Sequence, residues 1–177
     1  MGVLEIHPWG ARNDRPDRPD RIIFDLDPGE GLGFADVMGA AHDLCAVLAE
    51  KKLEAFAKTT GGKGLHVVVP ITRSYDWPTV KAFAKRIAES MAGDAPERFL
   101  TKVSKAERKG RIFIDYLRND PTSTAIAPYS TRAKAGAPVA MPVEWEALVP
   151  DFDPAMFDVR TVPEYLAQRN RDPWAEI

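Results

Sequence analysis

Apolar residues recur at helical spacing in two long segments of this chain. In 34–51 they fall three or four residues apart, and the same spacing returns in 77–92. One side of each segment is therefore apolar, which predicts two amphipathic helices that pack on a core. The tail, 142–177, offers only short helical turns, at 142–147 and 162–169.

Shorter apolar runs, rich in β-branched and aromatic residues, predict strands. Gly, Pro, Asn and Asp bound many of these runs, as expected where strands end in turns. Several strands combined with two long helices predict a sheet that is covered by helices on one face. The predicted strands are 21–26, 53–58, 65–69 and 111–117, and residues 125–127 lie in or beside another.

The composition is that of an ordinary globular domain. The chain has 177 residues, of which 45% are hydrophobic and 28% charged, which is enough for one domain with a core. No apolar run reaches the length of a membrane span and no signal peptide opens the chain, which predicts a cytoplasmic protein. The net charge of −2 argues against a wholly basic nucleic-acid surface but leaves room for a local basic groove.

Two acids at the end of the first predicted strand are the most informative feature. Asp25 and Asp27 follow the apolar residues 22–24. Side chains two residues apart on a strand point to the same face, so these carboxylates lie side by side and repel each other. A divalent cation is the usual way to neutralise such a pair, and oxygen ligands suit Mg²⁺ or Mn²⁺. The pattern is typical of two-metal phosphoryl transfer.

A third acid, Asp115, stands near the end of another apolar strand, 111–117. Taken alone, it is equally well explained as a solvated acid on an edge strand. Beside Asp25 and Asp27 it becomes a candidate third carboxylate, and three carboxylates could hold two metal ions.

A glycine-rich loop precedes the predicted strand 65–69. Its glycines would let backbone N–H groups approach a phosphate closely, and its lysine adds a positive charge. The loop lacks the Ser or Thr that follows the lysine of a Walker A loop, and a tight hairpin turn with a solvated lysine is the alternative interpretation. The loop consists of Thr60, Gly61, Gly62, Lys63 and Gly64.

Basic residues gather just before the strand that carries Asp115. Charge runs are usually solvated surface, but this one leads to the predicted metal site, where an anionic substrate would lie. Because arginine binds phosphate oxygens with two hydrogen bonds, Arg108 and Arg132 are candidate triphosphate ligands. His66 is equally well explained as a core histidine of its strand. The basic run consists of Lys102, Lys105, Arg108, Lys109 and Arg111.

Five motifs in one order resemble a known family. They lie at 4–9, 23–29, 60–67, 112–116 and 126–132. Together they resemble, over nearly the whole chain, the polymerase domain of bacterial ATP-dependent DNA ligase D, a member of the archaeo-eukaryotic primase superfamily. The resemblance implies an α+β fold with a primase-like catalytic core. In this fold an RRM-like antiparallel sheet is packed by helices on one face and has the acids on its open face. We expect a single domain, with its core at about 21–135 and an irregular C-terminal extension at about 136–177.

The resemblance also implies roles for individual residues. Asp25, Asp27 and Asp115 match the catalytic, metal-binding carboxylates of the family. Thr60 stands where the family usually has a serine that contacts the nucleotide phosphate, so the hydroxyl is kept. No role follows for Arg118, where some relatives carry glutamine. The other residues implied in nucleotide binding are His7, Gly61, Gly62, Lys63, Gly64, His66, Arg108 and Arg132.

The implied activity is nucleotidyl transfer of the DNA-directed polymerase or primase type. NTPs, with ribonucleotides preferred, would be added to primer 3′-hydroxyl ends during double-strand break repair by non-homologous end joining. The implied cofactors are two Mn²⁺ or Mg²⁺ ions. The implied partners are DNA ends or gapped duplex DNA, Ku, and ligase and nuclease modules on other chains, in the cytoplasm at the bacterial nucleoid. No membrane partner is expected.

The chain departs from the family at its start. Family polymerase domains have a substantial segment upstream of the 4–9 motif, with basic and aromatic residues that hold the template and the downstream 5′-phosphate. Here Met1 and Gly2 open almost directly at that motif, so we expect the upstream segment to be missing. Two other functions stay open: an NTP- or nucleic-acid-binding module without autonomous polymerase activity, and another metal-dependent phosphotransferase or nuclease that uses the same acids.

Overall fold

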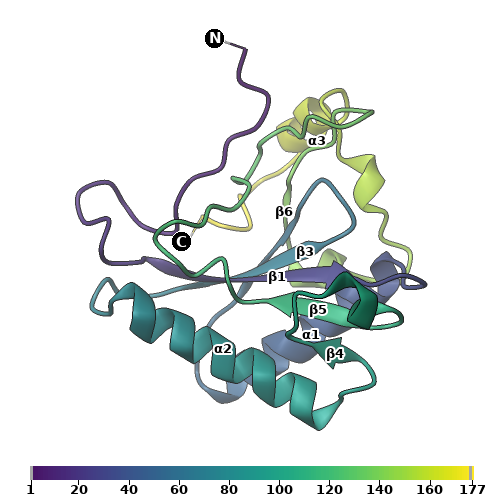
Figure 1. Cartoon of the computed structure of the whole chain (residues 1–177). Helices are drawn as coiled ribbons and strands as arrows, with labels where there is room; N and C mark the ends of the chain where they lie inside the picture. The colour runs from purple at the N-terminus through teal and green to yellow at the C-terminus, as the bar shows by residue number, and fades with distance from the viewer. Residues whose placement is uncertain (1, 176) are drawn as a thin grey trace.

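A computed structural model describes residues 2–175 and residue 177 of the chain (Figure 1). Within these residues the centre is a six-stranded sheet with the strand order β4-β5-β1-β3-β2-β6. Neighbouring strands run antiparallel except β4 and β5, which run parallel. The strands are β1 (Arg21–Pro28), β2 (Phe56–Thr59), β3 (Leu65–Pro70), β4 (Phe99–Leu100), β5 (Ile112–Asp115) and β6 (Pro142–Val143).

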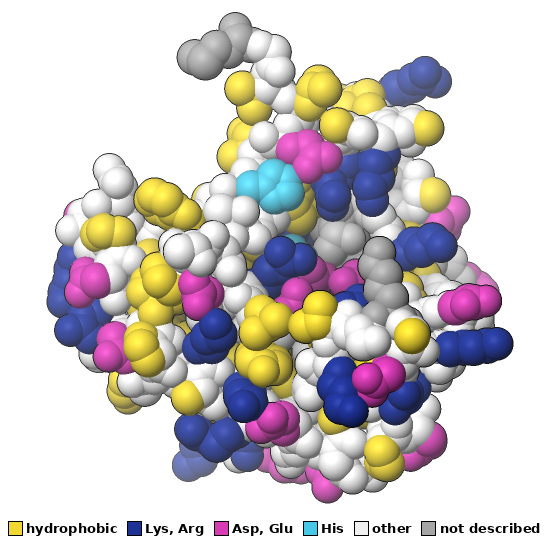
Figure 2. Space-filling view, in the orientation of Figure 1, with side chains coloured by type: hydrophobic (Ala, Val, Ile, Leu, Met, Phe, Trp, Pro, Cys, Tyr) yellow, Lys and Arg dark blue, Asp and Glu magenta, His cyan; other side chains and the backbone are white. Residues whose placement is uncertain are grey.

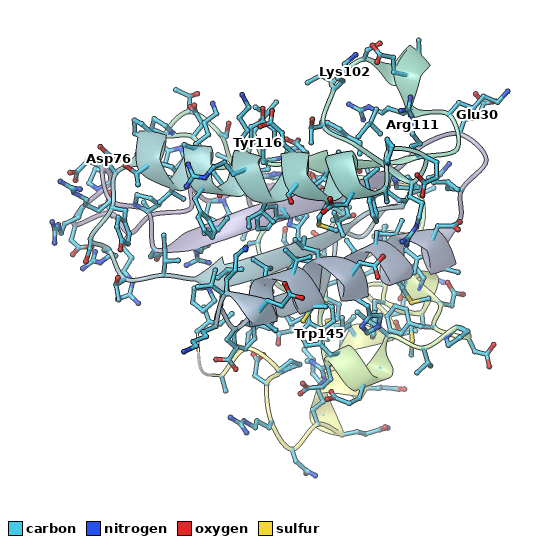
Figure 3. All side chains as sticks on the ribbon, turned by 90° about the horizontal axis from the view of Figure 1, so that it is seen from below. Glu30, Asp76, Lys102, Arg111, Tyr116 and Trp145 are labelled. Atoms are coloured by element: carbon cyan, nitrogen blue, oxygen red, sulfur yellow. The ribbon has the colours of Figure 1, made fainter. Side chains whose placement is uncertain are left out.

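Two long helices cover one face of the sheet, and Figure 3 shows them side by side from below. The predictions of helices at 34–51 and 77–92 are confirmed by α1 (Phe34–Glu50) and α2 (Trp77–Asp94). Asp76 caps α2 by accepting a hydrogen bond from the Thr79 N–H at 3.0 Å, which fixes where this helix begins. No helix in the described part of the chain is long and apolar enough to cross a membrane.

Alternate residues of the strands divide between the two faces of the sheet. Phe24, Leu26, Val67 and Ile114 point toward the helices and are fully buried, together with Leu44 of α1. The residues between them on the same strands therefore face away from the helices. The predicted α+β fold, with helices on one face of a largely antiparallel sheet, is confirmed.

Three local predictions need correction. The two-residue strand β4 was missed, because so short a segment leaves no periodicity. Residues 125–127 form no strand; instead the Ala125 and Ala127 N–H groups donate to the carbonyls of Pro8 (3.3 Å) and Ile6 (2.8 Å). The predicted helical turn at 142–147 begins as β6, which pairs with β2.

The rest of the C-terminal segment consists of short helices around the core. They are the 3₁₀ helices η2 (Trp145–Ala147) and η3 (Pro154–Met156) and the α-helix α3 (Val162–Ala167); a further 3₁₀ helix, η1 (Lys105–Arg108), lies before β5. Val143, Leu148, Phe157 and Val162 are buried in the main core. The segment predicted as an irregular extension thus supplies both an edge strand and core side chains.

Candidate active site

Polar side chains from four strands form one row across the face of the sheet that the helices leave open. Asp25 on β1 lies opposite Asp115 on β5 and His66 on β3. His66 in turn lies opposite Lys58 on β2. Asp27 follows two residues along β1, on the same face. The structure thus brings together the three acids that the sequence indicated.

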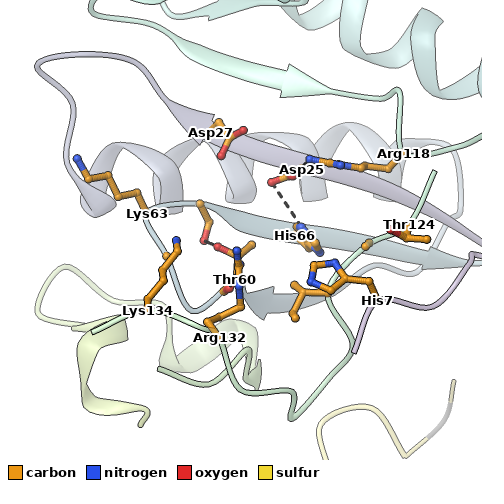
Figure 4. Close-up of a pocket in the computed structure, with 14 residues that line it drawn as sticks. His7, Asp25, Asp27, Thr60, Lys63, His66, Arg118, Thr124, Arg132 and Lys134 are labelled. Carbon is orange, nitrogen blue, oxygen red and sulfur yellow. Dashed lines mark hydrogen bonds and ion pairs between the residues drawn. The ribbon is translucent and has the colours of Figure 1, made fainter. Parts of the chain in front are cut away.

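The row borders a pocket of about 210 Å³ (Figure 4). Figure 2 shows acidic side chains at the bottom of a hollow, with basic side chains and a histidine around it. The predicted residues that line the pocket are His7, Asp25, Asp27, Thr60, Gly62, Lys63, Gly64, His66 and Arg132. The pocket is also lined by five residues that were not predicted to belong to the site: Arg118, Thr124, Ala125, Ile126 and Lys134. Gly61, Arg108 and Asp115 lie outside this lining.

The glycine-rich loop lies against the end of β1. A Cβ atom at Gly64 would stand 2.8 Å from the Leu26 carbonyl oxygen and 3.0 Å from Asp27 Oδ1. Gly61 has a φ of +64°, and a Cβ atom there would meet Arg132 at 2.7 Å. Because only glycine has no Cβ atom, the loop can bring its backbone this close to the acids. The exposed side chain of Lys63 lies on the same side of the pocket as Asp27 (Figure 4).

Arg132 connects this loop to the N-terminal segment. Its guanidinium donates to the Thr60 carbonyl at 2.7 Å and to Glu5 Oε1 at 3.1 Å. Glu5 Oε2 lies 2.7 Å from His7 Nε2. The hydrogen bond with His7, with help from the Ala133 N–H and Arg132, lowers the pKa of Glu5 to about 2. Glu5, which sequence reasoning missed, thus positions two of the predicted nucleotide ligands.

Arg108 lies above the neighbouring strand β5. Its guanidinium carbon is 3.8 Å from the centre of the Phe113 ring, and Nη2 donates to the Val103 carbonyl at 2.7 Å. Phe113 lies opposite Asp27 in the register of β1 and β5, so Arg108 stands beside the acids. Its positive charge opposes the rise in the pKa of Asp27. Its predicted role as a phosphate ligand stays a prediction.

The three acids differ in their electrostatic surroundings. Burial opposes ionisation of Asp25, but contacts with His66 and Arg118 outweigh burial and lower its pKa to about 2. Burial and the charges of Asp25 and Asp115 raise the pKa of Asp27 to about 6. Burial also raises the pKa of Asp115. Burial is the main cause of both raised pKa values, so Asp27 and Asp115 ionise less readily than solvated carboxyl groups.

Lys58 lies beneath the pocket and is 2% exposed. Its Nζ donates to the Ile126 carbonyl at 3.0 Å, which ties the 124–127 segment to the sheet. Burial and the nearby Arg132 lower the pKa of Lys58 to about 7. A buried lysine on a strand leaves no sequence signal that separates it from a solvated one, so sequence reasoning missed it.

Comparisons with known proteins agree on one class of domain. The model of the LigD primase-polymerase domain matches residues 1–174. The polymerase domain of Mycobacterium tuberculosis ligase D, solved in complex with DNA, matches with a TM-score of 0.83 and 32% sequence identity. This match covers 93% of the present chain and 60% of that chain. The fold is therefore that of a primase-polymerase domain.

Two curated relatives narrow the assignment. The multifunctional non-homologous end joining protein LigD of Pseudomonas aeruginosa is 40% identical over 177 residues, and the bifunctional LigD of Bacillus subtilis is 31% identical over 162 residues. The matches cover 99% and 90% of this chain, but only 21% and 26% of those proteins. The chain belongs to the LigD primase-polymerase domain family and spans about a fifth to a quarter of these relatives. The resemblance inferred from the five motifs is confirmed.

Proposed function

We propose that this chain is a metal-dependent nucleotidyltransferase that adds nucleotides from NTPs to primer 3′-hydroxyl ends in non-homologous end joining. The observation that carries the proposal is the placement of three carboxylates on one sheet face beside a basic, glycine-rich pocket. Carboxylates suit divalent cations, and the basic pocket suits a triphosphate. Membership of the LigD primase-polymerase family supports the same reaction.

The donor set fits a divalent cation. Asp25, Asp27 and Asp115 offer hard oxygen donors, and a bound cation would offset the burial and the Asp25 charge that raise the pKa of Asp27. When bound, such cations would lower the pKa of the 3′-hydroxyl and stabilise the pyrophosphate leaving group. As the described side chains stand, no three His, Cys, Asp or Glu residues are grouped to hold a metal ion. The carboxylates would therefore turn toward the cation as it binds.

The chain's own residues would bind and orient the nucleotide. Lys63, Lys134 and Arg132 line the same pocket as the acids and would neutralise the triphosphate, together with the N–H groups of the glycine-rich loop. His7 lies at the other end of the pocket from Lys63 (Figure 4). Its Nε2 lies 2.7 Å from Glu5 Oε2, so Glu5 holds the ring. This arrangement would fix the α-phosphate near the acids, which is the positioning that phosphoryl transfer needs.

Family membership extends the proposal to partners. The similar M. tuberculosis domain was solved with DNA, which supports DNA ends or gapped duplexes as the polymer substrate. A preference for ribonucleotides and cooperation with Ku follow from the family resemblance, and we include both in the proposal.

Primer extension tests the proposal. The substrate is a gapped duplex with a 5′-phosphate, supplied with Mn²⁺ and either rNTPs or dNTPs. We expect incorporation by the wild-type chain and a loss on the order of a hundredfold or more in Asp25→Asn, because this change removes a ligand for the cation. The matched control is Asp43→Asn, which removes an exposed acid paired with Arg98 at 2.7 Å. Full activity of Asp25→Asn would contradict the mechanism.

A second candidate is an NTP- or nucleic-acid-binding module that does not transfer nucleotides. The observation that favours it is that the described acids are not grouped as a ready metal site. Binding and extension should be measured on the same preparation. Retained binding of Mn²⁺-NTP in calorimetry, with no extension of any primer, would support this module over the polymerase.

A further inference from the structure

The turn after β5 is fixed to the sheet by a buried asparagine. Asn119 is 1% exposed. Its side chain accepts from the Ile23 N–H at 2.9 Å and donates to the carbonyls of Ile23 and Tyr116, each at 2.8 Å. Asn119 thereby satisfies the backbone of β1 where β5 has ended. The turn between Asp115 and Asn119 is held in one place, and Arg118 is carried on it.

Arg118 bridges two of the three acids. Its Nη2 lies 3.1 Å from Asp25 Oδ2, and its Nε lies 3.4 Å from Asp115 Oδ2 (Figure 4 shows the approach to Asp25). The other two oxygens of these carboxylates also have neighbours. Asp115 Oδ1 accepts from the Leu117 N–H at 2.8 Å, and Asp25 Oδ1 lies 3.5 Å from His66 Nε2. Every oxygen of this carboxylate pair thus lies within 3.5 Å of a nitrogen of the protein itself.

Arg118 carries a guanidinium, whose positive charge is permanent and whose planar donors match carboxylate oxygens. The carboxylate of Asp27 makes no hydrogen bond or ion pair with the described residues. The guanidinium of Arg118 is therefore the permanent cation in contact with the acid cluster.

We propose that Arg118 is a resident counter-ion, which occupies oxygens of Asp25 and Asp115 in the metal-free protein and must release them when a divalent cation binds. The inference rests on the proposed function, since it concerns the same acids. It explains why three acids on one face are not grouped as a metal site: two of them are turned to Arg118. A side chain that is 39% exposed and lines the pocket has room to move away.

Arg118→Gln tests the inference through Mn²⁺ binding, measured by the electron spin resonance signal of free Mn²⁺. We expect the variant to bind Mn²⁺ roughly three- to tenfold more tightly, because the cation no longer displaces a guanidinium. Without metal, the variant should melt at a lower temperature than the wild type, and Mn²⁺ should raise its melting temperature by more. Arg118→Lys should bind Mn²⁺ with intermediate affinity, because an ammonium cannot bridge both carboxylates. This second variant keeps a charge in place if Arg118→Gln folds poorly.

The matched control is Arg98→Gln, which breaks the exposed ion pair between Arg98 and Asp43. Neither residue lines the pocket, so this change should leave Mn²⁺ affinity unchanged. Unchanged or weaker Mn²⁺ binding by both Arg118 variants, with Asp25-dependent binding by the wild type, would overturn the inference alone. If neither the wild type nor the Arg118 variants bind Mn²⁺ in a way that depends on Asp25, the metal site of the proposed function is wrong. The inference about Arg118 is then wrong as well.

Discussion

The two faces of the central sheet are built from alternate residues of the same strands and have opposite chemistry. Toward the helices, Phe24 and Leu26 of β1 are fully buried among apolar side chains. Toward the pocket, Asp25 and Asp27 of the same strand lie among a histidine, a lysine and an arginine. The first face stabilises the fold by removing apolar surface from water. The second buries charge, which costs stability and creates a site for cations and anions.

The two faces of the sheet should therefore respond differently to substitution. The helix-covered face should respond to substitution mainly through stability, because its side chains are closely packed. The open face should respond mainly through ligand binding, and removing the carboxylate charge of Asp27 should even stabilise the metal-free protein. Four substitutions test this contrast, beginning with the one that should affect stability most.

Leu44→Ala should give the largest loss of stability. Leu44 of α1 is fully buried against the sheet, so its truncation leaves a cavity and should lower the free energy of unfolding by about 3 kcal/mol. For a chain of this size the melting temperature should fall by about 6–12 °C. Denaturant and thermal unfolding measure this effect. Mn²⁺ affinity measured well below the melting temperature should not change; a large change would break the contrast between the two faces.

A pair of glycine substitutions compares the two faces with the same chemical change. In Gly64→Ala the added methyl would stand 2.8 Å from the Leu26 carbonyl oxygen, so the loop must shift and we expect a cost of about 1–3 kcal/mol and weaker NTP binding. Gly39 lies within α1. Apart from its chain neighbours and the backbone of the helix itself, no atom lies within 4 Å of a Cβ atom added there. Gly39→Ala should stabilise the protein by about 0.5–1 kcal/mol, because alanine favours helix. Thermal unfolding and calorimetric NTP titration of both variants check the contrast, and equal effects would refute it.

Asp27→Asn should give a small change in stability, in the opposite direction to Leu44→Ala. The pKa of Asp27 is raised from 3.8 to about 6 in the folded protein, so folding favours its protonated form. Its contribution to stability is therefore lost as pH rises from about 4 to about 6. Asparagine carries no charge and should remove this loss, which stabilises the metal-free protein at pH 7 by about 1 kcal/mol after allowance for partial exposure.

Melting temperatures at pH 4 and pH 7 without metal measure the effect of Asp27→Asn. The gain in melting temperature should appear at pH 7 and vanish at pH 4. At pH 4 Asp27 is protonated in the folded wild-type protein, and asparagine carries no charge at any pH. Asp43→Asn, on the exposed surface of α1, should show no such pH dependence. If Asp27→Asn were less stable than the wild type at pH 7, burial and the charge of Asp25 would not destabilise the Asp27 carboxylate as the structure indicates.

Much of the fold followed from local patterns in the sequence. The two helices were predicted within two residues at each end, because a stripe of apolar residues at helical spacing is a strong signal. β4 and β6 were missed because each has two residues, and their pairing depends on partners distant in the chain. A strand of that length is selected by the sheet edge that it meets rather than by its own sequence.

The candidate site divides in the same way. Alternation along β1 was enough to predict that Asp25 and Asp27 share a face, and the motif order was enough to connect Asp115 with them. Glu5, Lys58 and Arg118 could not be assigned from the sequence, because each acts through residues far away in the chain. Charged residues of these types are usually solvated, so nothing local marks them as part of a site.

By itself, the sequence determined the helices, the main strands, the family and the three acids, since each depends on local spacing or on motif order. Only the tertiary structure decided which cations meet those acids. The register of β1 with β3 and β5 places His66 and Asp115 opposite Asp25, and the Asn119 turn brings Arg118 between two carboxylates. The physical reason is that electrostatic interaction depends on distance in space and on burial, and both are set only when separate segments pack together.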